Sequence, residues 1–75
     1  MEIEERIMLD IGKFDESISR LKSKKIAEKE RSVVELAEMY AKDAEAWLKK
    51  KDFYTAFASI SYAHGLLDAI IKLNK

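Results

Sequence analysis

Apolar residues recur at steps of three and four along most of this 75-residue chain, and no proline interrupts them. Such spacing places apolar side chains on one face of an α-helix, and proline is the residue that most strongly breaks a helix. Alanine, leucine, glutamate and lysine, which favour helices, are abundant as well. The sequence therefore predicts an all-α fold.

The first predicted helix spans residues 2–22. Its first turn carries glutamates and its end carries lysines, an arrangement that complements the helix dipole. Gly12 lies in its middle at a cost of roughly 1 kcal/mol relative to alanine, so we expect a neighbouring element to pack closely there. The apolar stripe of this helix comprises Ile3, Ile7, Ile11, Phe14, Ile18 and Leu21.

The second predicted helix spans residues 28–50. Its clearest starting signal is Ser32 followed by Glu35, a pair that fits a capping box. The residues just before Ser32 are good helix formers, which extends the predicted start to residue 28. Its expected core stripe comprises Val33, Leu36, Ala37, Tyr40, Ala44 and Trp47, widened on one side by Val34, Ala41 and Leu48.

The third predicted helix spans residues 52–73 and begins at Asp52, a favourable N-cap. The short join at Lys51 and Asp52 makes the second and third helices antiparallel. The apolar face of the third helix is wide enough to contact both others, so residues 1–75 form one domain, an up-down-up antiparallel three-helix bundle. That face comprises Phe53, Ala56, Phe57, Ile60, Ala63, His64, Leu67, Ile70 and Ile71, extended by Tyr62, Leu66 and Leu73.

The chain is small, neutral overall and free of cysteine. Its 14 basic and 14 acidic residues cancel, which argues against a general polyanion binder. A chain of this length buries only about 60% of its unfolded surface, and without cysteine it has neither a disulfide nor a thiolate metal site. A partner subunit is one of the few remaining ways to supplement so small a core.

Composition also bears on location and source. No apolar run approaches the roughly 20 residues of a membrane span, and the acidic start MEIEER has the wrong charge for a signal peptide. We therefore expect a cytoplasmic protein with no membrane partner. Glutamine is absent and asparagine occurs once, whereas lysine, glutamate and isoleucine are abundant, a bias typical of thermophiles.

The segment from Tyr40 to Leu73, YAKDAEAWLKKKDFYTAFASISYAHGLLDAIIKL, resembles the DUF357 family of archaeal proteins. The resemblance rests on Tyr40, the Asp43-Ala44 pair, a hairpin turn, the Ala56-Phe57 step and the run SYAHGLLDA. It implies an archaeal source and a three-helix bundle, and it implies no established activity. Lys51 departs from the family, which often has glycine at this position. If residue 51 must be left-handed, lysine destabilises the turn.

His64 is the only histidine and the sharpest candidate for chemistry. Asp68 follows it at i+4, so a carboxylate could orient the ring. A polar site would need Asp43, Tyr40 and Tyr62 to come close. Ferritin-like metal bundles place glutamate three residues before histidine, but Ser61 occupies that position. We therefore interpret His64 as a packing residue bonded to Asp68 or to an acceptor on the second helix, and assign no catalytic residue, metal ligand or cofactor.

The outer face of the third helix carries short side chains beside one exposed aromatic residue. Aromatic residues near the hairpin turn are expected to fill the core, except for Tyr54. Small residues at helical spacing let another backbone approach closely. The leading hypothesis is therefore a non-enzymatic interaction module for protein docking or homo-oligomerisation. Its candidate interface comprises Tyr54, Ala58, Ser61, Gly65 and Ala69.

The segment RLKSKKIAEKER between the first two helices is the only basic concentration. Such residues could contact phosphates, which gives an alternative function as a weak RNA or DNA accessory domain. Glu28 and Glu30 dilute the charge, so a solvated connector is the simpler interpretation. An enzyme or metal site around His64 ranks third. The candidate nucleic-acid contacts are Lys22, Lys24, Lys25, Lys29 and Arg31.

Overall fold

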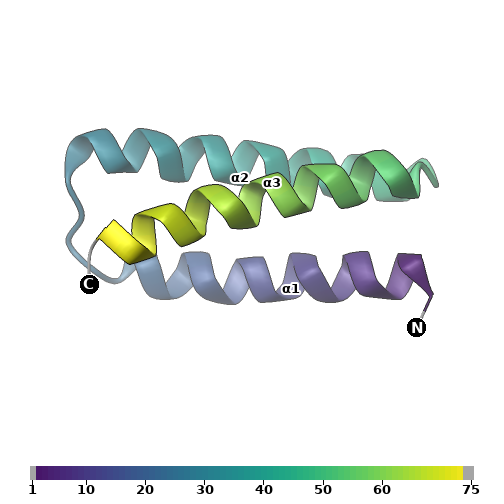
Figure 1. Ribbon diagram of the computed structural model, residues 1–75, viewed down its shortest axis with the longest axis horizontal. Coiled ribbons are helices and arrows are strands. Elements are labelled where there is room, and N and C mark those ends of the chain that lie inside the picture. The colour runs from purple at the N-terminus through teal and green to yellow at the C-terminus, as the bar shows by residue number, and fades with distance from the viewer. Residues whose placement is uncertain (1, 74–75) are drawn as a thin grey trace.

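The computed structural model describes residues 2–73 as three α-helices joined by two short connections (Figure 1). Helix α1 spans Ile3–Lys22, α2 spans Glu28–Lys49 and α3 spans Phe53–Leu73. Helices α1 and α3 run in one direction and α2 runs in the other (Figure 1). The prediction of an all-α, up-down-up three-helix bundle is confirmed, and each helix bound falls within one residue of the predicted one.

Helix α3 lies at the centre of the fold. It packs along α2 to form a close hairpin, and α1 packs mainly on α3 rather than on α2. In Figure 1, α3 lies between α1 and α2 and in front of α2, so one long side of it faces away from the bundle. None of the three helices combines the length and the apolar character that crossing a membrane requires.

The core of α2 is built from small side chains, and this corrects the predicted stripe. Leu36 and Trp47, which were expected in the core, are 39% and 36% exposed. The small residues of α2 face the core instead, and small side chains allow α2 and α3 to approach closely. The buried residues of α2 are Val34, Ala37, Ala41 and Ala44.

The buried face of α3 is narrower than predicted. It contains a single stripe at helical spacing, formed by Ala56, Ile60, Ala63, Leu67 and Ile70. Four residues expected on the wide apolar face are exposed instead: Phe57, Tyr62, Ile71 and Leu73. Because three helices enclose only a small core, they cover one stripe of α3 and leave both flanks in contact with solvent.

The turn between α2 and α3 has the hydrogen bonds of a Schellman motif. Asp52 N–H donates to the Trp47 carbonyl, and Lys51 N–H donates to the Leu48 carbonyl, each at 3.0 Å. Lys51 has a φ of 66°, so it adopts the left-handed conformation that the motif requires. Asp52 then caps α3 as predicted, because its carboxylate accepts hydrogen bonds from the Thr55 N–H and hydroxyl.

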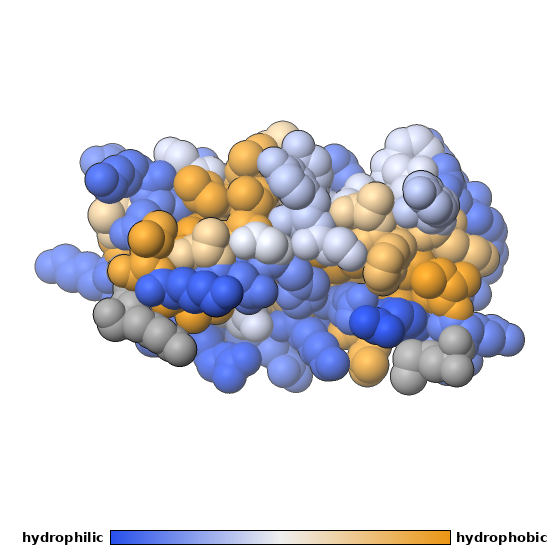
Figure 2. Space-filling model, in the orientation of Figure 1, coloured by the Kyte–Doolittle hydropathy of each residue, from blue (hydrophilic) through white to orange (hydrophobic). Residues whose placement is uncertain are grey.

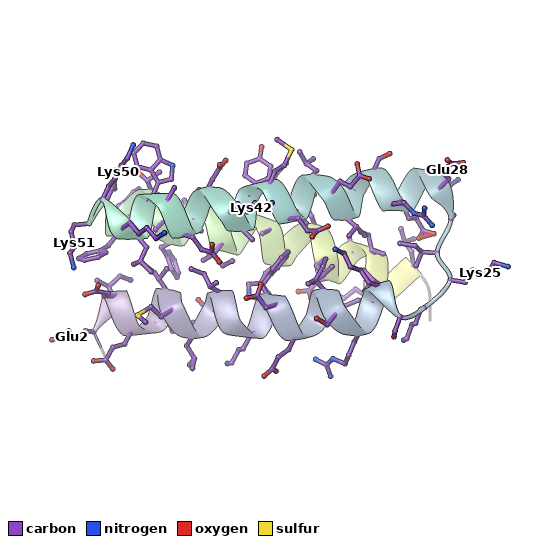
Figure 3. All side chains as sticks on the ribbon, turned by 180° about the vertical axis from the view of Figure 1, so that it is seen from behind. Glu2, Lys25, Glu28, Lys42, Lys50 and Lys51 are labelled. Carbon is purple, nitrogen blue, oxygen red and sulfur yellow. The ribbon has the colours of Figure 1, made fainter. Side chains whose placement is uncertain are left out.

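Replacing Lys51 with glycine is expected to stabilise the protein. A left-handed residue that carries a Cβ costs roughly 1–2 kcal/mol, so Lys51→Gly should raise the melting temperature by several degrees. The substitution also removes the exposed ion pair between Lys51 Nζ and Glu4 Oε2 at 3.3 Å, which is worth at most about 1 kcal/mol. Figure 3 shows Lys51 at the end of the bundle where α1 begins.

Lys50→Gly is the matched control for this turn. Lys50 has a φ of −81°, an ordinary helical value, and its ammonium lies 5.0 Å from the centroid of the Trp47 ring. Glycine there gains no relief from strain and loosens the end of α2, so the melting temperature should fall. Equal shifts of the same sign for the two variants would contradict the assignment of strain to Lys51.

The start of α2 and the two glycines also differ from expectation. Helix α2 begins at Glu28 after Ala27, without a side-chain cap, so Ser32 and Glu35 lie inside the helix and form no capping box. A Cβ added at Gly12 or at Gly65 would meet no atom within 4 Å. The expectation that a neighbouring element of the chain packs against Gly12 is therefore wrong, and Gly65 has no such contact either.

Candidate interaction surface on helix α3

The outward face of α3 lacks charge over the first 15 residues of the helix. From Phe53 to Leu67 the helix contains no Asp, Glu, Lys or Arg, and its only charged residues are Asp68 and Lys72 near its end. Helices α1 and α2 carry charged residues along their whole length. A helix face in contact with water is normally charged or polar, so α3 differs from its neighbours on the side that the bundle leaves uncovered.

All five predicted interface residues lie on this uncovered side. Each is exposed, and Tyr54 reaches 88% exposure. Figure 2 shows the same side of the molecule, with orange and pale residues over α2 and α3 and blue residues gathered along α1. We call this set the α3 surface; it comprises Tyr54, Ala58, Ser61, Gly65 and Ala69.

Large side chains of α2 continue the apolar surface beyond α3. The rings of Tyr40 and Tyr62 meet edge to face with their centroids 4.6 Å apart, which joins the two helices at this border. Leu36, Tyr40 and Trp47 recur at helical spacing along the border, and Met39 beside them is 61% exposed. Sequence reasoning missed this extension because it placed the large residues of α2 in the core.

His64 connects α3 to α1. Its Nε2 atom lies 2.8 Å from the backbone carbonyl oxygen of Asp10. Because a carbonyl only accepts, Nε2 carries the proton and donates it. The rings of His64 and Phe14 pack edge to face, with their centroids 5.7 Å apart and their planes at 88°. The partner is therefore on α1, and the predicted hydrogen bond to Asp68 or to α2 is not formed.

The residues of the predicted polar site occupy different borders of the bundle. Tyr40 and Tyr62 meet on the α2 side, whereas His64 is bonded to α1. Asp43 and Asp68 are exposed, on α2 and α3 respectively. Within residues 2–73, no three His, Asp or Glu side chains come together in a way that could hold a metal ion.

The basic residues at the α1–α2 connection surround a shallow cavity of about 350 Å³. Lys22, Lys24 and Arg31 line it, but Glu35 and Glu38 line it too. Lys22 Nζ lies 2.9 Å from Glu38 Oε2, so this ammonium is already paired. The other two candidate contacts, Lys25 and Lys29, are exposed outside the cavity, and Figure 3 shows Lys25 extending away from the bundle.

A comparison with protein families matches residues 10–75 to the family described as protein of unknown function, DUF357. The chain belongs to DUF357. The match includes all of α2 and α3 and begins inside α1, so it covers the whole α3 surface of this DUF357 protein. No curated protein matches the chain. The family description assigns no activity, and the function must be argued from the surface itself.

Proposed function

We propose that this DUF357 protein is a small helical interaction module that binds a protein through the α3 surface. The observation that carries the proposal is an exposed helix face without charge over 15 residues, Phe53 to Leu67, in a chain with 37% charged residues. Contiguous exposed apolar surface in a small protein marks an interaction site. Binding there would bury Tyr54 and the large side chains of the α2 border.

The size of the core supports the same proposal. The core is one cluster of fourteen buried residues, five of which are alanines, and the chain has no disulfide. Small domains without such covalent support often gain stability from a partner. A partner on the α3 surface would bury apolar area in addition to that of the small core.

His64 supports a non-enzymatic reading of the site. Its Nε2–H is engaged by the Asp10 carbonyl, and its ring lies against Phe14. The other ring nitrogen, Nδ1, keeps its lone pair, but no three His, Asp or Glu side chains within residues 2–73 come together as metal ligands. The contacts of His64 instead fasten α1 to α3, which keeps the α3 surface facing outward.

A photo-crosslinking amino acid at position 54 tests the proposed function. Position 13 on α1 is the control, because Lys13 is exposed on a charged helix. In cells that express the two variants, we expect position 54 to give one predominant crosslinked protein that position 13 does not give. Equal crosslinking at both positions, or none at position 54, would remove the proposal.

An RNA- or DNA-binding role at the α1–α2 connection is the weaker proposal. Phosphate contacts there would give an affinity that falls steeply with salt. The pairing of Lys22 with Glu38, and the presence of Glu35 in the same cavity, reduce the positive potential available to a phosphate. A gel shift of labelled RNA or duplex DNA at low salt tests this role, and the absence of a shift excludes it.

We also propose a cytoplasmic protein of a thermophilic archaeon. Support comes from the residue bias, with no glutamine, one asparagine and abundant lysine and glutamate. The lack of cysteine is compatible with a reducing compartment.

A further inference from the structure

We draw no further inference here: the strongest candidate, the apolar border between α2 and α3 formed by Leu36, Trp47 and Tyr62, belongs to the surface for which an interaction is already proposed, and nothing in the structure shows what covers it.

Discussion

Phe14→Ala is expected to lower the free energy of unfolding by about 3–5 kcal/mol, the usual cost of truncating a buried phenylalanine. Phe14 is 1% exposed and is among the largest fully buried side chains of the described residues. It packs on the ring of His64, so its loss leaves a cavity between α1 and α3 and removes an aromatic contact. Urea denaturation followed by circular dichroism measures the change.

Phe57→Ala provides the control for this truncation. Phe57 is 38% exposed on α3, so the same atoms are removed from a site that solvent already reaches. Its cost should stay below about 1.5 kcal/mol, because little cavity forms. Comparable losses for the two variants would show that α1 does not depend on Phe14 to pack on α3.

The helix bounds were predictable because their signals are local. Asp52 caps α3 through its own carboxylate, and the absence of proline leaves each helix uninterrupted. The strained turn was anticipated from the resemblance to DUF357, since a glycine common in the family is lysine here, and residue 51 is left-handed in the structure. The exception is the Ser32-Glu35 pair, which matches a capping box but lies within α2 because the preceding residues are strong helix formers.

The orientation of α2 was not predictable from hydrophobicity alone. Its large apolar residues and its alanines lie on adjacent faces, and both faces satisfy helical spacing. The structure buries Ala37, Ala41 and Ala44, because their small side chains permit the close approach of α3, and it moves Leu36 and Trp47 to the border. The distance between two helices is a property of the pair, and one helix sequence does not specify it.

The α3 surface was predictable from nearby residues, whereas the hydrogen-bond partner of His64 was not. The uncharged outer face was readable from α3 itself, including the exposure of Tyr54. The partner of His64 was not, since the Asp10 carbonyl lies 54 residues away and every residue carries a carbonyl. A backbone acceptor leaves no signature in the sequence.

His64→Ala is expected to destabilise the protein by about 2–3 kcal/mol. The substitution removes the ring volume beside Phe14 and leaves the Asp10 carbonyl without the donor it now has. For a domain of this size the melting temperature should fall by roughly 10 °C. Thermal melts at one fixed protein concentration measure it, because association of copies would otherwise change the apparent stability.

Two further variants separate packing from chemistry at His64. Glutamine can place an amide N–H close to the position of Nε2, so His64→Gln should retain more stability than His64→Leu, which fills volume without donating to Asp10. Added zinc should leave the melting temperature of the wild type unchanged. A metal-binding histidine would give the opposite pattern, in which zinc stabilises the wild type strongly and His64→Ala removes that stabilisation without lowering the metal-free melting temperature.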